Sequence, residues 1–228
     1  MSIQITWRGH GTFSLDFAGT AVVVDPFFAG NNPAAKMGVE NVAADFILQT
    51  HGHADHIVDT VSLATRTGAT VICVPEIGGW LENQGVKNIH AMNTGGGWNF
   101  PFGRVKLTPA LHSSGLPDGS YGGDPIGFVV TSEGKRIYIA GDTALFSDMA
   151  LIGKAGLDVA ILPIGDNFTM GPGDALEAVK LLKPKVVIPC HFNTWPVIEA
   201  DVSNWAILVK EKTDAKPVVL GVDETYTL

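Results

Sequence analysis

Four residues with metal-binding side chains lie close together in the segment QTHGHADHIVD: His51, His53, Asp55 and His56. His51 and His53 are two positions apart after an apolar run. At the mouth of a strand they can turn the same way and reach one ion, whereas on a helix they would diverge. Asp55 and His56 begin an expected helix and can reach a second position nearby. Imidazole and carboxylate groups suit zinc, manganese or iron, so the segment predicts a metal site. The alternative is a polar helix cap with solvated histidines.

Three more ligand-type residues each follow an apolar run that is typical of a strand. His112 follows RVKLTPAL, Asp142 follows RIYIAG and His191 follows KVVIPC. Each alone could be an ordinary polar group at a strand end. Together with the first cluster they place five of the seven histidines at strand ends. No cysteine is positioned to close the site as in a structural zinc finger, so an open, catalytic coordination is expected.

The elements that must position these side chains are short and punctuated by the 27 glycines and 13 prolines of the chain. Ala18-Gly19 and Glu133-Gly134 predict hairpin turns. Strand, helix, strand units before and after the middle of the chain predict two mixed sheets packed together with helices outside. The predicted strands are 3–7, 12–17, 20–27, 44–50, 68–75, 104–111, two within 125–142, 156–164 and 185–190, and the predicted helices are 55–67, 174–184 and 197–212.

Composition limits the classes of protein that this chain can belong to. Its 228 residues, 46% of them hydrophobic, are enough for one core, so we expect a single domain over residues 1–228. The formal charge of −8, without basic clusters, argues against a nucleic-acid partner. Cys73 and Cys190 lie in apolar runs, which fits a reducing compartment. Without a signal peptide or membrane span, we expect a cytoplasmic protein with no membrane partner.

The order of these motifs resembles that of the metallo-β-lactamase superfamily over nearly the whole chain. Asp25, the His51 to His56 cluster, His112, Asp142 and His191 match the superfamily's motifs in chain order. The segments WRGHGTFSL, DPFFAGNNP, PIGDNFTMGP and HFNTWPVIEAD are similar to a narrower branch of small metal-dependent hydrolases, mostly of unassigned substrate and related to L-ascorbate-6-phosphate lactonase. The resemblance implies an α/β (α+β) fold, a four-layer αββα sandwich with metals at the edge of two sheets.

The resemblance also implies a role for each matched residue. His51, His53 and His112 would bind a first metal, while Asp55, His56 and His191 would bind a second and Asp142 would bridge the two. Asp25 would hold a ligand histidine through the far ring nitrogen, although an aspartate before proline can also simply form a turn. His10, in the tight turn RGHGT, would bind substrate or donate a proton, or would be an ordinary turn histidine.

Other residues near the predicted site have two interpretations each. Asn193 and Thr194 either contact a substrate oxyanion or shape the turn before Pro196. The loop 113–125 is expected to form a substrate rim, although an ordinary crossover is the alternative. Phe168 and Met170 would form a pocket wall or pack in the core. Trp98 and Phe100 are expected to fold back on the core from a turn-rich connection.

The predicted activity is metal-dependent hydrolysis. One or two divalent ions, zinc first and manganese, nickel or iron as alternatives, would lower the pKa of water from 15.7 toward about 7 and so supply hydroxide at neutral pH. Asp142 would orient the nucleophile, and Asp55 is the second candidate catalytic carboxylate. The expected partner is a small molecule with an ester, lactone, amide or phosphoester bond. An iron-dependent redox enzyme and, less favoured by charge, a phosphodiesterase or ribonuclease are the alternatives, and self-association into a homo-oligomer is possible.

Overall fold

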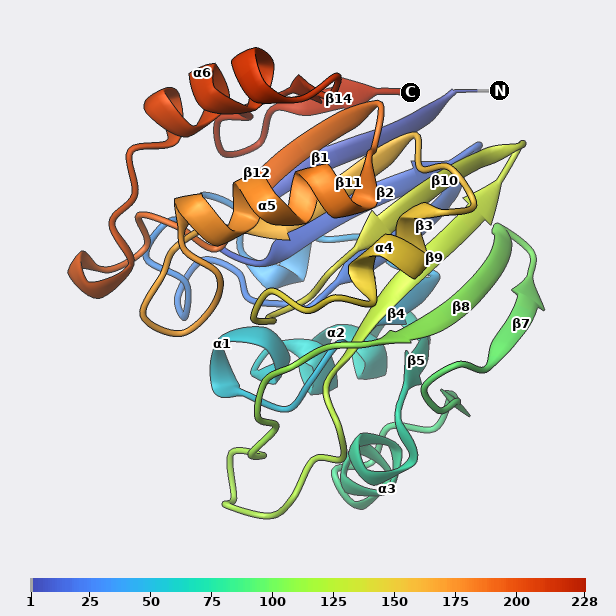
Figure 1. Ribbon diagram of the computed structural model, residues 1–228. Helices are drawn as coiled ribbons and strands as arrows, with labels where there is room; N and C mark the ends of the chain where they lie inside the picture. Colours follow the sequence, from blue (N-terminus) through green and yellow to red (C-terminus); the bar gives the residue numbers. More distant parts are fainter. Residues whose placement is uncertain (1) are drawn as a thin grey trace.

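Two seven-stranded sheets form the centre of the computed structural model, which describes residues 2–228 (Figure 1). The first sheet has the order β14 (Thr225–Thr227), β1 (Ile3–Gly9), β2 (Thr12–Phe17), β3 (Thr20–Val24), β4 (Phe46–Leu48), β5 (Thr70–Cys73) and β6 (Ile89–Ala91). The second has the order β13 (Lys216–Pro217), β12 (Val186–Cys190), β11 (Val159–Pro163), β10 (Lys135–Ile139), β9 (Ile126–Ser132), β8 (Gly103–Pro109) and β7 (Gly97–Phe100). Each sheet is antiparallel on one side and parallel on the other.

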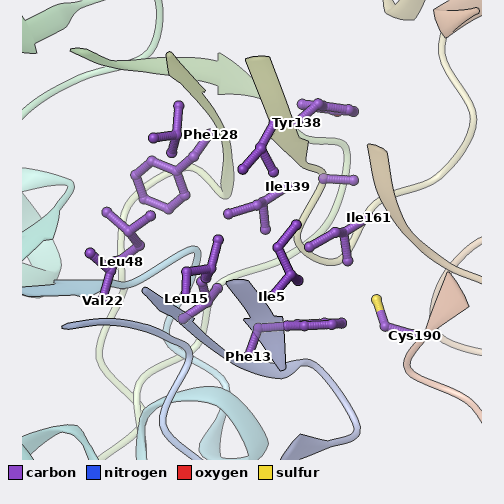
Figure 2. Close-up of a cluster of buried hydrophobic side chains, with 14 of the residues drawn as sticks. Ile5, Phe13, Leu15, Val22, Leu48, Phe128, Tyr138, Ile139, Ile161 and Cys190 are labelled. Carbon is purple, nitrogen blue, oxygen red and sulfur yellow. The ribbon is translucent and has the colours of Figure 1, made fainter. Parts of the chain in front are cut away.

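The two sheets face each other across an apolar core. Ile5, Leu15 and Leu48 of the first sheet lie opposite Phe128 and Ile139 of the second (Figure 2), and all five side chains are almost fully buried. The register explains this arrangement, because Ile5 pairs with Leu15 and Phe128 pairs with Ile139, so each pair points to one face of its sheet. The parallel strands are buried on both faces and read as continuous apolar runs.

Helices cover the outer faces of both sheets, so the arrangement is the expected four-layer αββα sandwich (Figure 1). The first sheet carries α1 (Ala54–Ile57), α2 (Thr60–Thr67) and α3 (Pro75–Asn83), and the second carries α4 (Met149–Gly153), α5 (Pro172–Leu182) and α6 (Val202–Lys212). Two short 3-10 helices, η1 (Val39–Asn41) and η2 (Pro196–Ile198), lie in loops. None of the helices described here has the length and apolarity needed to cross a membrane.

The helix expected over residues 55–67 is two helices, because Asp59 interrupts it. The Asp59 N–H donates to the Pro26 carbonyl (3.2 Å) instead of continuing the first helix. Its carboxylate accepts from the Phe28 N–H and from Asn31 Nδ2, both at 2.7 Å. The break therefore fastens the end of α1 to the loop after β3, which contains Asp25.

The other predicted turns, connections and helices agree with the structure to different degrees. Both predicted hairpin turns are present, with positive φ angles at Ala18-Gly19 and Glu133-Gly134. The prediction for residues 93–103 was wrong for Trp98, which is 56% exposed in β7, and right for Phe100, which packs against the core. The helix predicted over 197–212 is shorter, since its start is η2 and an extended stretch before α6.

Candidate metal centre

The side chains singled out in the sequence meet at one edge of the sandwich, where several strands end. Asp25 follows β3 and His51 follows β4 in the first sheet, while Asp142 follows β10 and His191 follows β12 in the second. His112 lies just beyond β8, which runs in the same direction as β10 because both are antiparallel to β9. The edge therefore collects groups from both sheets.

Asp142 lies at the centre of the cluster. Its Oδ2 atom is 3.0 Å from His191 Nε2, 3.4 Å from His56 Nε2, 3.6 Å from His112 Nε2 and 4.0 Å from His51 Nε2. The Asp142 side chain is only 5% exposed. One carboxylate oxygen thus faces four imidazole nitrogens from three segments of the chain.

The remaining ligand-type atoms near this carboxylate form overlapping groups. His51, His53 and His112 each offer a nitrogen within 4.8 Å of the others, and His51 Nε2 is 3.0 Å from His53 Nδ1. Asp55, His56 and His191 form a second group with the same limit, which also includes His10. A third group, Asp25, His51 and His56, shares a histidine with each of the other two.

The donor atoms are arranged as a cation would require. The Nε2 atoms of His56 and His191 are buried and make no hydrogen bond of acceptable geometry, although both face Asp142. Buried polar atoms normally have a partner, so two such nitrogens aimed at one carboxylate indicate that another group belongs between them. Imidazole nitrogens with carboxylate oxygens are a donor set for zinc and other divalent transition metals. The residues present therefore fit a metal.

The charge states differ within the cluster. Burial opposes the charged forms of His56 and His191, but Asp142 raises the pKa of His56 well above its usual value and that of His191 to about 9. Burial lowers the pKa of His51 well below its usual value, and burial likewise lowers the pKa values of His53 and His112, which keeps their ring lone pairs available. Burial opposes the charged form of Asp142, but His191 and His56 hold the pKa of this carboxyl well below its usual range. Burial opposes the charged form of Asp55 as well, but His10, His191 and His56 together lower the pKa of this carboxyl.

Asp25 fixes the rings of two histidines through hydrogen bonds, that of His56 directly and that of His51 through Thr50. Its Oδ2 is 2.8 Å from His56 Nδ1 and accepts the Thr50 hydroxyl at 2.6 Å. Since that hydroxyl is used as a donor, His51 Nδ1, 2.9 Å from Thr50 Oγ1, must donate to it. Asp25 and Thr50 thereby fix the orientation of both rings, with each Nε2 directed toward Asp142. The buried Asp25 side chain also accepts from the Thr50 N–H and Gln49 Nε2 through Oδ1.

His10 is fully buried and lies between Thr194 and Asp55. Its Nδ1 is 2.8 Å from Thr194 Oγ1, and its Nε2 is 3.0 Å from Asp55 Oδ2. Burial, with a smaller contribution from His191, lowers the pKa of His10 to about 4, so the ring is neutral at pH 7. An ionised carboxylate only accepts, so Nε2 carries the proton and Nδ1 accepts the Thr194 hydroxyl. This tautomer makes His10 a donor to Asp55.

Comparisons with known proteins agree with this geometry. The beta-lactamase superfamily domain matches residues 20–192, which contain every residue of the cluster except His10. The chain belongs to the beta-lactamase superfamily. A UPF0173 metal-dependent hydrolase of Heliobacterium modesticaldum is 47% identical over 99% of this chain and 98% of its own length. One from Thermus thermophilus is 51% identical over 92% of each chain. At these identities the chain is a member of the UPF0173 metal-dependent hydrolases.

A solved structure supports the assignment over the whole fold. Igni18, described as a novel metallo hydrolase from the archaeon Ignicoccus hospitalis, superposes with a TM-score of 0.91 at 36% sequence identity. The match covers 100% of this chain and 99% of that one. The fold expected from the sequence resemblance is therefore confirmed.

Two glycines allow the backbone to pack closely at this edge of the sandwich. A Cβ atom on Gly11 would lie 2.8 Å from His56 Cε1, and one on Gly165 would lie 2.1 Å from the His191 carbonyl oxygen. The His191 N–H donates to the His10 carbonyl at 3.0 Å, which joins the turn after β1 to the loop after β12. Gly11, which directly follows His10 in RGHGT, therefore leaves room for the His56 ring.

Residues with two interpretations at the sequence level separate in the structure. Asn193 has a positive φ and its Oδ1 accepts the Ala200 N–H at 2.8 Å, so its side chain closes the turn. Met170 is 1% exposed and packs in the core, whereas Phe168 is 55% exposed. The loop 113–125 reaches the site, because Ser113 Oγ is 3.2 Å from His53 Nε2.

Sequence reasoning missed two polar contacts of the site. Thr50 bridges Asp25 and His51 by hydrogen bonds, and Ser114 Oγ accepts the Gly52 N–H at 3.0 Å. Thr50 directly precedes the first histidine of the motif, so its position next to a ligand was visible in the sequence. The contact of Ser114 spans 62 residues and had no local signal.

Proposed function

We propose that the protein hydrolyses an ester, lactone, amide or phosphoester bond of a small molecule with the help of one or two divalent ions, zinc first among them. The observation that carries this proposal is the convergence of buried, unpartnered histidine nitrogens on the Asp142 carboxylate. A structural role alone would not favour so many desolvated polar groups at one place.

The proposed ligands follow the two groups of the cluster. One ion would be held by His51, His53 and His112, and another by Asp55, His56 and His191, with Asp142 between them. A bound divalent ion supplies Lewis acidity, which polarises a substrate oxygen and brings the pKa of water toward about 7.

The chain's own residues then have distinct tasks. Asp25 fixes the ring of His56 directly and that of His51 through Thr50, so their Nε2 atoms stay aimed at the site. Asp142 orients the attacking water through its carboxylate. Asp55 is 28% exposed against 5% for Asp142, so Asp55 is the carboxylate that solvent reaches and the one that can pass a proton outward.

Metal analysis coupled to a hydrolysis screen tests the proposal. The purified protein is expected to bind one or two divalent ions per chain, and to hydrolyse at least one class in a panel of esters, lactones, amides and phosphoesters once the metal is restored. His53→Ala and Asp142→Ala should abolish turnover while circular dichroism still shows the fold. His90→Ala is the matched control, because His90 lies in β6 against Trp98 and Phe100 and outside the cluster. Hydrolysis retained by both cluster variants would contradict the proposal.

A further inference from the structure

The segments that surround the metal centre carry almost no positive charge. They are residues 25–38, 49–59, 110–125, 140–148, 164–171 and 191–201, which we call the rim segments. Lys36 is the only lysine or arginine in them, although the chain has fifteen such residues. Lys36 Nζ is directed to the Val222 carbonyl (3.3 Å), and the nearby Arg8 pairs with Asp223 at 2.9 Å. Both cations are therefore turned toward the C-terminal segment.

Hydrogen bonds tie the rim segments to one another beside the proposed ligands. The Leu111 N–H donates to Thr143 Oγ1 at 3.0 Å, and the Met170 N–H donates to the Thr143 carbonyl at 3.1 Å. The Trp195 ring lies 4.8 Å from the His10 ring. These contacts bring three of the loops together, and Figure 1 shows them on the side of the molecule where α1 lies. These three loops therefore lie beside His112 and Asp142, and a substrate bound at the site would be close to their side chains.

The same segments expose apolar side chains. Val58, Leu111, Phe168 and Val197 are 41%, 53%, 55% and 59% exposed. Single exposed apolar residues are common on protein surfaces. These four, however, come from four rim segments. Val58 is two residues after His56 and Leu111 directly precedes His112.

The charges present on the rim are negative. The exposed acidic residues of the rim segments are Asp118, Asp124, Asp148, Asp166, Glu199 and Asp201. A substrate with an anionic tail would meet these carboxylates on the rim, and the one cation of the rim segments, Lys36, is directed to the Val222 carbonyl. Arg104, Lys106 and Arg136 lie outside the rim segments and line a separate pocket beside Asp148. Phosphate and carboxylate groups are normally recognised by such cations.

We propose that the rim selects an uncharged substrate: a neutral carboxylic ester, lactone or amide whose apolar substituent packs on Leu111, Phe168 and Val197. This inference rests on the proposed hydrolase function and narrows it by setting phosphoesters aside. Hydrolysis breaks the acyl C–O or C–N bond, places the hydroxyl group of water on the acyl carbon and delivers its proton to the leaving oxygen or nitrogen.

Binding of two hydroxamic acids tests the selectivity without turnover. Hexanohydroxamic acid and the monohydroxamic acid of adipic acid share a metal-binding head, and their tails differ only in ending in methyl or carboxylate. Titration calorimetry on the metal-loaded protein is expected to show about tenfold tighter binding of the hexanoyl compound. Equal affinity, tighter binding of the adipoyl compound, or no binding of either would overturn the inference.

A charge placed on the rim should reverse this preference. Phe168→Lys is expected to shift the ratio of the two affinities about tenfold toward the adipoyl compound, because it supplies the missing cation. Ile207→Lys is the matched control, since Ile207 is also 55% exposed but lies on α6, outside the rim segments. An unchanged ratio in Phe168→Lys, or an equal shift in the control, would contradict the assignment of Phe168 to substrate selection.

Turnover separates this inference from the function on which it rests. The p-nitrophenyl esters of hexanoic acid and of adipic acid, the latter a monoester, present the same tails on a reactive acyl group. A higher kcat/KM for the hexanoyl ester supports both statements, and a higher value for the adipoyl ester overturns the neutral-substrate inference alone. Failure to hydrolyse either ester, with the hydroxamate preference intact, would count against the hydrolase and leave the selectivity of the rim standing.

Discussion

The contact between His10 Nε2 and Asp55 Oδ2 joins a buried, neutral ring to a proposed ligand carboxylate. Because the Asp55 carboxylate only accepts, the His10 ring donates to it through Nε2, and its Nδ1 accepts the Thr194 hydroxyl. Groups that orient a ligand in this way typically change metal affinity by about 10- to 100-fold when they are replaced. His10 is therefore a positioning residue for one half of the cluster.

His10→Gln is expected to weaken the binding of one ion by about 10- to 100-fold and to leave the other unchanged. Thr194→Val should produce a smaller change in the same direction, since it removes only the hydroxyl that His10 Nδ1 accepts. Zinc titration calorimetry on metal-depleted protein measures both affinities. His90→Gln makes the same replacement outside the cluster and should bind like the parent. Identical affinities in His10→Gln and the parent would show that Asp55 does not need this donor.

At the level of helices and strands, the apolar runs made most of the strands predictable. Helix α3 and strand β14 had no such local signal. The runs ending at Leu48 and Cys190 are strands because buried parallel strands need continuous apolar sequence. Helix α3 was missed since its Gly78-Gly79 pair lowers helix propensity, and Gly78 is required there by packing against Ile89. Strand β14 was missed because its pairing with β1 bridges the two ends of the chain.

In the site too, features with a local sequence pattern were predictable and those set by long-range contacts were not. The ligand types were visible because each follows a strand, so fold and chemistry point to the same positions. The hydrogen bond between His10 and Thr194 links residues 184 positions apart, and no local sequence pattern predicts it. Long-range polar partners thus depend on the folded topology rather than on the spacing of residues.

Asp158 connects three strands at the end of the second sheet away from the metal centre. Its Oδ2 accepts the Arg136 N–H of β10 and its Oδ1 accepts Lys185 Nζ just before β12, both at 2.9 Å. Burial opposes its charge, but the bond from Lys185 and that from Arg136 keep the pKa of Asp158 below its usual value. A lowered pKa stabilises the folded state above the unfolded pKa of about 3.9 and loses this effect as the pH falls through the folded pKa.

Asp158→Asn is therefore expected to reduce the free energy of unfolding by about 1 kcal/mol at pH 7, a modest value because the Lys185 side chain is 77% exposed. The difference from the parent should shrink below about pH 4. Urea denaturation at several pH values measures it, with Asp214→Asn, at an exposed position two residues after the end of α6, as the control. A difference that stays constant down to pH 3 would contradict the assigned role of the Asp158 charge.

Across the whole molecule, the proposed ligands connect the two sheets. His51 belongs to the first sheet and His112, Asp142 and His191 to the second, so a cation held among them joins both halves of the sandwich. An ion that binds the folded but not the unfolded chain stabilises the fold by mass action. Because the two sheets share one apolar core, this stabilisation should be felt by the whole chain and not only by the loops at the edge.

Removal of the metal by a chelator is expected to lower the unfolding temperature by about 10 °C. A free ion concentration 1,000-fold above the dissociation constant contributes about 4 kcal/mol, and each kcal/mol corresponds to about 2 to 4 °C for a chain of this size. Scanning calorimetry with EDTA and with added zinc measures the shift. Asp142→Ala should lose most of the dependence on the chelator, because it removes the carboxylate shared by both groups, and His90→Ala should keep all of it. Equal unfolding temperatures of the parent with EDTA and with zinc would mean that no ion bridges the sheets.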